Sequence, residues 1–186
     1  MWRLIWLFWL LAAPAVGTAQ SWVAFQALDA CPSWRCTVAL AATVSLRLDR
    51  SIPWRLPVRQ AARLSSGYGY RTDPLDGRRR FHAGVDLAAP LGCPVLAAGS
   101  GRVATGYDRN LGHYVTIDHL NGFVSTYGHL DRIAVTSGSV VGPQAVLGTV
   151  GQSGRTTGPH LHWSVSHVAS GGVDPLAVRR LFLAAH

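Results

Sequence analysis

The sequence predicts a mostly antiparallel β domain with little helix, and three observations support this prediction. From Leu64 onward the chain consists of short alternating or apolar runs, which are typical of strands. Gly, Pro, Asn and Asp separate these runs, as expected for tight turns. Helical periodicity is scarce. At 186 residues, 48% hydrophobic and 14% charged, the chain is long enough for one well-buried domain and too short for two ordinary ones.

The first residues have the features of an export signal. Arg3 supplies a positive charge, residues 4–13 form an unbroken apolar run, and residues 17–19 are small, as a signal peptidase requires. Because a bilayer span needs about 20 apolar residues and Pro14 interrupts this run, we expect a cleaved signal peptide over residues 1–19 rather than a membrane anchor. The mature protein is then exported to the periplasm or cell envelope, or secreted, without stable membrane insertion.

Residues 20–61 form an N-terminal extension that carries no clear chemistry. Cys31 and Cys36 flank a turn-like spacer, and an oxidising compartment favours a disulfide between them over two reduced thiols. Residues 43–49 alternate and predict a strand, which a proline-punctuated connector follows. The extension is either a packing element or a cover for a groove.

One domain is predicted over residues 62–178, with residues 179–186 as a C-terminal tail. Residues 118–122 have the composition of a hairpin turn, and residues 175–183 predict a short helix. Cys93 lies in an apolar stretch without His or Cys at ligand spacing, so we expect a buried structural thiol. The predicted strands cover residues 101–107, 113–119, 123–130, 145–150 and 160–168.

Two short motifs, His82-Ala-Gly-Val-Asp86 and His160-Leu-His162, together offer three imidazoles and a carboxylate. This is the ligand chemistry of a zinc site that keeps one position open for water. On a strand, His160 and His162 point to the same face, about 7 Å apart, so one can bind metal while the other reaches the substrate. Four extended residues span about 13 Å, so the segment from His82 to Asp86 must bend, which Gly84 permits. Either motif alone arises readily by chance among eight histidines, whereas their joint presence indicates a metal site.

Six motifs follow one another through the domain: Ser66-Gly-Tyr-Gly-Tyr-Arg71, Phe81-His-Ala-Gly-Val-Asp-Leu87, Ala97-Ala-Gly-Ser-Gly-Arg-Val103, Val115-Thr-Ile-Asp-His119, Thr126-Tyr-Gly-His-Leu130 and Thr157-Gly-Pro-His-Leu-His-Trp163. In content and order they resemble the M23 family of zinc metallopeptidases, the lysostaphin-type peptidoglycan endopeptidases also called LytM domains. The resemblance covers residues 64–178, roughly three fifths of the chain. It implies a two-sheet antiparallel β fold with a groove-bound metal site.

Transferred residue by residue, the resemblance implies one Zn²⁺ per chain, with His82, Asp86 and His162 as ligands. It makes His129 and His160 two catalytic histidines that do not bind the metal. The chain has no Glu, so the Glu base of other zinc proteases is unavailable. His160 and His129 are therefore expected to share proton handling and stabilisation of the oxyanion, and the sequence does not decide which residue does which. We assign His160 the role of base and His129 the support of the oxyanion.

The resemblance implies hydrolysis of peptidoglycan stem or cross-bridge peptides. The alternative within this family is a non-catalytic cell-wall-binding protein or an activator of wall amidases, as members that lack ligands are; here all five positions are filled. A formal charge of +8 suits an anionic partner. Nucleic acid is disfavoured because the chain has no RNP-type, zinc-finger or helix-turn-helix pattern. The sequence leaves the oligomeric state open.

Several other residues have two interpretations. Tyr68, Tyr70 and Tyr127 are either groove walls or packing residues. The run from Arg78 to Arg80 is either a solvated loop or a guide for anionic substrate. Surface or turn positions are expected for the remaining histidines, which are His113, His119, His167 and His186.

Overall fold

The computed structural model of the chain describes residues 49–58 and 62–185, which belong to one compact unit that begins at Leu46. The predicted signal peptide, Cys31, Cys36 and nearly all of the strand predicted at 43–49 lie outside the described residues. Asp49 itself is helical, as are the next two residues. In the part of the chain that is described, no helix is both long enough and apolar enough to cross a membrane.

The described unit consists of short strands followed by one helix, α3 (Pro175–Ala184). The strands are β1 (Arg63–Ser66), β2 (Gly69–Thr72), β3 (Arg79–His82), β4 (Val85–Ala88), β5 (Pro94–Leu96), β6 (Gly101–Asp108), β7 (Gly112–Asp118), β8 (Phe123–Ile133), β9 (Val140–Val141), β10 (Val146–Val150), β11 (His160–His167) and β12 (Gly171–Val173). Strands β6, β7, β8, β10 and β11 fall where the alternation predicts them.

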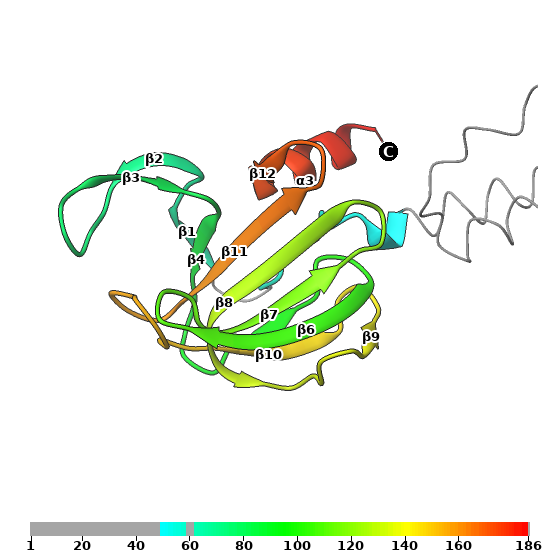
Figure 1. Cartoon of the computed structure of the whole chain (residues 1–186), viewed down its shortest axis with the longest axis horizontal. Helices are drawn as coiled ribbons and strands as arrows, with labels where there is room; N and C mark the ends of the chain where they lie inside the picture. Colours follow the sequence, from blue (N-terminus) through cyan, green and yellow to red (C-terminus); the bar gives the residue numbers. More distant parts are fainter. Residues whose placement is uncertain (1–48, 59–61, 186) are drawn as a thin grey trace, which may run out of the picture. The chain divides into compact units, whose positions relative to one another are not determined.

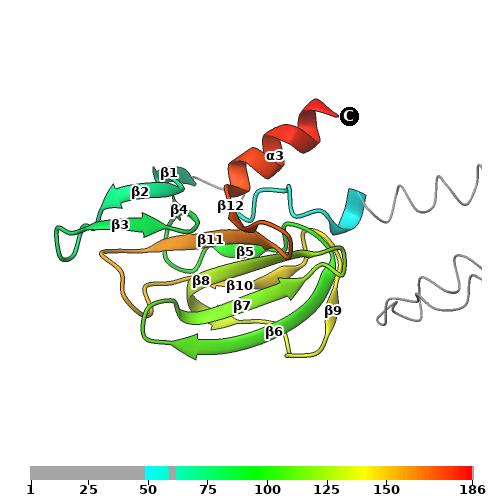
Figure 2. The same cartoon turned by 45° about the horizontal axis from the view of Figure 1, so that its top comes forward.

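The strands form two antiparallel sheets, which confirms the predicted fold class. The main sheet has the order β1-β4-β11-β8-β7-β6-β9, with β12 beside β11 and β5 paired to β10, which also pairs with β8 (Figure 1). The second sheet is the β2–β3 hairpin, which projects beyond the end of the main sheet (Figure 2). Strand β8 extends past its predicted end at residue 130 because Ile133 pairs with Gly148 of β10, a partner that local alternation cannot indicate.

The side chains of strand β11 alternate between the hydrophobic core and the opposite face of the strand. Leu161, Trp163 and Val165 are at most 1% exposed and pack into the core. Burying such a side chain contributes about 1.5–3 kcal/mol. His160 and His162 alternate with them and therefore point to the opposite face of the strand. The core thus fixes which way both imidazoles point.

His119 corrects one expectation, because it lies in the turn as predicted but is buried in the core rather than at the surface. It is 2% exposed, and its Nδ1–H donates to the Ser100 carbonyl at 2.7 Å. Its Nε2 lies 2.8 Å from Ser125 Oγ, which in turn lies 2.9 Å from the Tyr127 hydroxyl. The Tyr127 hydroxyl accepts from the Ala98 N–H at 2.9 Å, so Tyr127 is a packing residue rather than a groove wall. The turn at residues 118–122 forms as predicted, but its histidine points inward.

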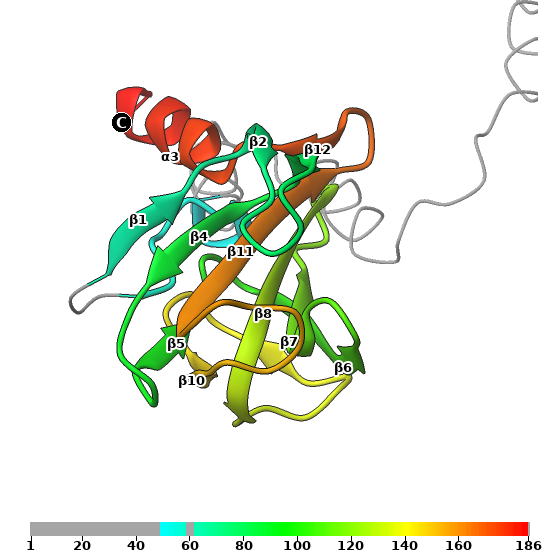
Figure 3. The ribbon, with the colours of Figure 1, turned by 90° about the vertical axis from the view of Figure 1, so that its left-hand side faces the viewer.

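Helix α3 contacts β11, and it also contacts the segment before β1 through Trp54. Figure 3 shows the helix above β1. It starts where predicted, because Asp174 caps it by accepting from the Leu176 N–H at 2.9 Å and Pro175 occupies its first turn. The Phe182 ring stacks on Trp54 with centroids 4.6 Å apart. The helix continues to residue 184, past the domain end predicted at residue 178.

Candidate metal centre

A sharp bend between β3 and β4 brings the first two candidate ligands together. His82 ends β3, and Asp86 is the second residue of β4, so only two residues lie between the strands. His82 Nε2 consequently lies 3.1 Å from Asp86 Oδ1. Gly84 lets this bend lie close against β11, since a Cβ at this position would lie 2.7 Å from the Trp163 carbonyl oxygen and 2.8 Å from His162 Cε1. No other residue fits without displacing the backbone of β11.

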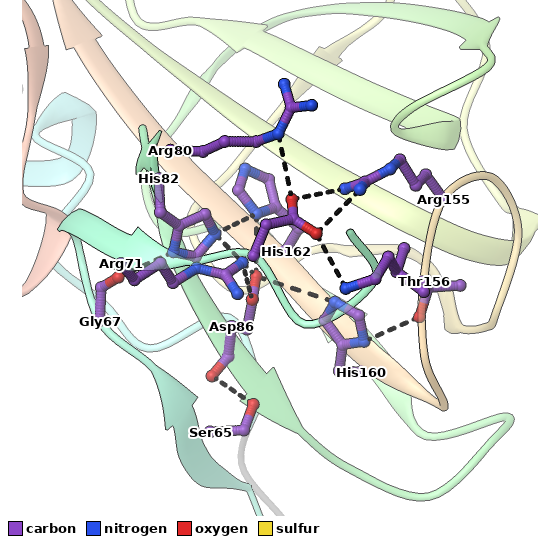
Figure 4. A network of polar contacts seen from close by, with 12 residues as sticks. Ser65, Gly67, Arg71, Arg80, His82, Asp86, Arg155, Thr156, His160 and His162 are labelled. Carbon is purple, nitrogen blue, oxygen red and sulfur yellow. Dashed lines mark hydrogen bonds and ion pairs between the residues drawn. The ribbon is translucent and has the colours of Figure 1, made fainter. Parts of the chain in front are cut away.

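Strand register supplies the third candidate ligand. His162 of β11 lies directly opposite Asp86 of β4 in the antiparallel pair. Its Nδ1 is 2.9 Å from Asp86 Oδ1 and 3.1 Å from His82 Nε2. Figure 4 shows the three side chains converging from two neighbouring strands and the end of the hairpin.

The three atoms fit a catalytic zinc ion in both chemistry and spacing. They form a nearly equilateral triangle with edges of 2.9–3.1 Å. Ligands about 2.0–2.2 Å from a tetrahedral zinc ion lie about 3.3–3.5 Å apart, so a small outward movement of each side chain suffices. Two imidazoles and one carboxylate leave a fourth position open, as in catalytic zinc sites. His82, Asp86 and His162 can therefore hold the metal.

Two of the three candidate ligands, His82 and Asp86, are oriented by a further hydrogen bond. The His82 Nδ1–H donates to the Gly67 carbonyl at 2.7 Å, which directs the Nε2 lone pair toward the metal position. Asp86 turns Oδ1 toward the histidines, while Oδ2 accepts from Arg71 Nη2 at 3.2 Å. Burial alone would raise the pKa of Asp86, but its contacts with His162 and His82 outweigh burial and hold the pKa well below the ordinary value. The carboxylate is therefore ionised.

His160 and His129 lie beside the triangle and are held by backbone carbonyls. The His160 Nδ1–H donates to the Gly158 carbonyl at 2.8 Å, and its Nε2 lies 3.7 Å from Asp86 Oδ1. The His129 Nδ1–H donates to the Ser153 carbonyl at 2.8 Å. The two rings are 4.6 Å apart. Each ring therefore keeps its Nε2 for the groove.

The backbone of His129 is strained. Its φ of 61° is left-handed, a conformation that costs roughly 1–3 kcal/mol for a residue other than glycine. The His129 N–H donates to the Leu111 carbonyl at 2.6 Å, which helps to maintain this conformation. Burial lowers the pKa of His129 to about 4, so the ring is neutral at pH 7.

The site opens into a groove of about 810 Å³. All five predicted site residues line it, together with Arg71, Arg80 and Arg155. Tyr68 and Tyr70 are not among the lining residues; Tyr70 is 70% exposed and packs edge-on against Phe81. His113, His119 and His167 also lie away from the groove, and His186 is outside the described residues.

The arginine run preceding His82 has three different environments. Arg78 is exposed, and the Arg79 guanidinium lies 5.1 Å from the Tyr70 ring centroid. Arg80 alone reaches the groove, where its Nη2 lies 2.6 Å from Asp76 Oδ2. The run is thus neither wholly solvated nor wholly aimed at the substrate.

Sequence reasoning missed the groups that orient the histidines. Gly67, Ser153 and Gly158 act through backbone carbonyls, which every residue type carries, so no side-chain pattern identifies them. Arg71 was detectable, since it closes the first of the six motifs, but its contact with Asp86 depends on the folded hairpin.

Comparisons with known proteins identify the family of the chain. The model of Peptidase family M23 matches residues 80–175. The DD-carboxypeptidase/endopeptidase Mpg of Neisseria meningitidis is 40% identical over 62% of this chain and 27% of its own length. The peptidoglycan DD-endopeptidase ShyC of Vibrio cholerae is 42% identical over 54% of this chain and 24% of its own length. The chain therefore spans about a quarter of the length of these curated relatives.

Solved structures show the same fold. A zinc-containing peptidase from Vibrio cholerae aligns with a TM-score of 0.60 and 36% identity, covering 66% of this chain and 38% of that one. The catalytic domain of the M23 protein EnpA from Enterococcus faecalis aligns with a TM-score of 0.57 and 30% identity, covering 66% of this chain and 95% of that one. For the catalytic domain of lysostaphin from Staphylococcus simulans the TM-score is 0.58 and the identity 25%, over 64% and 92% of the two chains.

Proposed function

The chain belongs to peptidase family M23, and we propose that it is a zinc-dependent endopeptidase that hydrolyses peptide bonds in peptidoglycan. One observation carries this proposal: a triangle of two imidazole nitrogens and a carboxylate oxygen lies in an open groove with two further histidines beside it. A protein that only binds the cell wall needs neither the open metal position nor the flanking histidines. The alternative of a non-catalytic activator of wall amidases is therefore less well supported.

The bound zinc ion would bring the pKa of water toward neutrality and polarise the scissile carbonyl. His82, Asp86 and His162 would hold it. His160 serves as the base, because the Gly158 carbonyl holds its Nδ1–H and its Nε2 lone pair faces the groove. From there, His160 returns the proton to the leaving amine.

His129 has a narrower role. Its Nδ1–H is already donated to Ser153, so its Nε2 carries no proton in the neutral ring. Support of a developing oxyanion therefore requires that His129 first accept a proton during the reaction. Before that step, His129 Nε2 can only accept a hydrogen bond, as His160 Nε2 does.

The substrate assignment rests on the relatives and on charge. Curated relatives are named peptidoglycan DD-endopeptidases, and a net charge of +8 favours a polymer that carries carboxylates. Because peptidoglycan lies outside the cytoplasm, the proposal includes export directed by residues 1–19.

The test uses purified mature protein, residues 20–186, and peptidoglycan of defined composition. We expect about one zinc ion per chain and released fragments whose masses identify a cleaved peptide bond. His162→Ala should abolish both the zinc and the fragments, whereas His167→Ala, on the same strand but outside the groove, should change neither. Protein without zinc, or cleavage that persists in a chelator and in His162→Ala, would refute the proposal.

A further inference from the structure

One loop holds both histidines that flank the metal position. Residues 151–159, which we call the histidine loop, connect β10 to β11. The Ser153 carbonyl accepts from His129 Nδ1 at 2.8 Å, and the Gly158 carbonyl accepts from His160 Nδ1 at 2.8 Å. Thr156 Oγ1 is also 3.2 Å from His160 Nδ1. The positions of both rings therefore depend on the conformation of this loop.

On one side, the histidine loop is attached to the main sheet. Ser153 Oγ donates to the Leu130 carbonyl at 2.7 Å and accepts from the His113 N–H at 3.0 Å. The Arg155 N–H donates to the Asn110 carbonyl at 2.9 Å. These bonds fix the first half of the histidine loop relative to the main sheet. They do not fix the distance between the loop and the opposite wall of the groove.

The Arg155 side chain makes the connection to that wall. Its Nη1 donates to Asp73 Oδ2 at 2.7 Å and its Nη2 to Asp73 Oδ1 at 2.8 Å, a two-pronged contact that fixes direction as well as distance. Arg80 Nε, from β3, also lies 3.7 Å from Asp73 Oδ2. Both Asp73 and Arg155 line the groove.

Asp73 is itself firmly placed. It is 7% exposed and starts the turn of the β2–β3 hairpin, where its Oδ1 accepts from the Leu75 N–H at 2.9 Å. The Arg155 guanidinium holds the pKa of Asp73 well below its usual range, so the pair stays charged at working pH. The same hairpin ends in His82, a candidate metal ligand. The Asp73–Arg155 pair therefore joins the segment that carries a ligand to the loop that orients the two other histidines.

We propose that Asp73 and Arg155 are positioning residues that set His129 and His160 relative to the metal ligands across the groove. The inference rests on the proposed function, because it assigns the pair a role in that reaction. Neither residue touches the reacting atoms; both act through the backbone carbonyls of the histidine loop. A displacement of a catalytic group by about 1 Å can cost about 100-fold in rate, so a small shift of the loop is sufficient.

Kinetics with matched variants provide the first test. Asp73→Asn removes the charge of one partner, and Arg155→Lys keeps the charge but loses the two-pronged contact. For both we expect kcat on peptidoglycan peptides to fall about 10- to 100-fold, with zinc content unchanged and KM changed less. Arg180→Gln removes the exposed pair between Arg180 and Asp174 on α3, at 3.3 Å, and should leave kcat unchanged. Full activity in Arg155→Lys would show that charge alone matters and would overturn the proposal.

The imidazole ¹⁵N signals of the zinc-loaded protein provide a test that does not depend on activity. In both variants the Nδ1 signals of His129 and His160 should shift, while that of His119, held by Ser100 away from the groove, should not. Unchanged ring signals, or a loss of kcat that merely follows the folded fraction, would refute the positioning role. If the wild-type chain failed to cleave peptidoglycan, the proposed function would fall, but the ring signals would still decide whether the pair positions the histidines.

Discussion

Two groups of polar residues lie toward opposite ends of the β7–β8 hairpin, and only one of them has the features of an active site. The core cluster consists of His119, Ser125 and Tyr127, and the site cluster consists of His129, His160 and the three candidate metal ligands. At one end, His119 donates its Nδ1–H to a backbone carbonyl, and burial lowers its pKa. At the other end, His129 does the same with Ser153, and burial lowers its pKa as well. A histidine held through Nδ1 in a buried place is therefore not in itself a sign of catalysis.

The two clusters differ in what lies next to the Nε2 atom of the histidine ring. His119 Nε2 lies next to the Ser125 hydroxyl, which contacts the Tyr127 hydroxyl, and the latter accepts from the Ala98 N–H, so each of these three side chains has a polar partner inside the core. The rings of His129 and His160 instead keep Nε2 for a groove that also contains an ionised carboxylate. The core cluster and the site cluster therefore differ in whether the Nε2 atom of the histidine faces a protein partner or the groove.

Removal of a metal ligand should give the largest difference between the two clusters, because zinc binding and cleavage should depend on the site cluster and not on the core cluster. His162→Ala or Asp86→Ala should reduce peptidoglycan cleavage to background and eliminate bound zinc, because the triangle loses a corner. His119→Ala should retain stoichiometric zinc. Metal analysis of the purified folded proteins checks both outcomes, and zinc loss in His119→Ala would show that the two ends are not independent.

Replacement of a flanking histidine should affect chemistry without affecting metal. For His129→Ala and His160→Ala we expect kcat to fall about 10²- to 10⁴-fold, the usual contribution of general acid–base groups, with about one zinc ion still bound. Measurement of kcat and of zinc content on the same samples of each variant tests this expectation. If these variants lose zinc as fully as His162→Ala, the division into ligands and catalytic histidines is wrong.

Arg71→Gln should produce a smaller effect, on metal affinity. Arg71 holds Asp86 Oδ2, and loss of such an orienting partner typically weakens metal binding about 10- to 100-fold. Competition with a chelator of known zinc affinity measures the change. Arg79→Gln, from the other face of the hairpin, serves as the control, and equal affinity in both variants would contradict the orienting role.

A substitution in the core cluster should change the stability of the protein without changing its zinc content or its activity. Ser125→Ala leaves the His119 Nε2 without its hydroxyl and should lower the free energy of unfolding by about 1–3 kcal/mol, with zinc and kcat unchanged. Urea denaturation with activity measured on folded protein checks this. A loss of kcat without a loss of stability would place this cluster in the catalytic machinery.

His119 should also contribute a pH dependence of known sign. Its pKa lies below the ordinary value of 6.5 in the folded protein, so the unfolded chain binds the proton first as pH falls. The stability from the neutral ring is complete above pH 6.5 and is lost as pH falls through the folded pKa. The loss between pH 7.5 and 5.5 should be smaller in His119→Gln than in the wild type, as urea unfolding at both values would show.

Much of the fold follows from local pattern, and much of the site does not. Alternation predicts β11 and places His160 and His162 on one face, because the period of a strand is two. The turn composition at residues 118–122 predicts the hairpin but not the inward direction of His119, since turn residues can point either way. The carbonyls of Ser153 and Gly158 are invisible in sequence, because the loop path that presents them depends on contacts with residues far along the chain.

The opposition of His162 and Asp86 across β11 and β4 restricts how descendants of this chain can vary in length. A single inserted or deleted residue within either strand would turn one of the two side chains into the core and leave the other alone. Substitutions can be tolerated one position at a time, but the spacing within these strands cannot drift. Length variation is expected instead in segments that carry no ligand, such as the mostly exposed loop between β8 and β9.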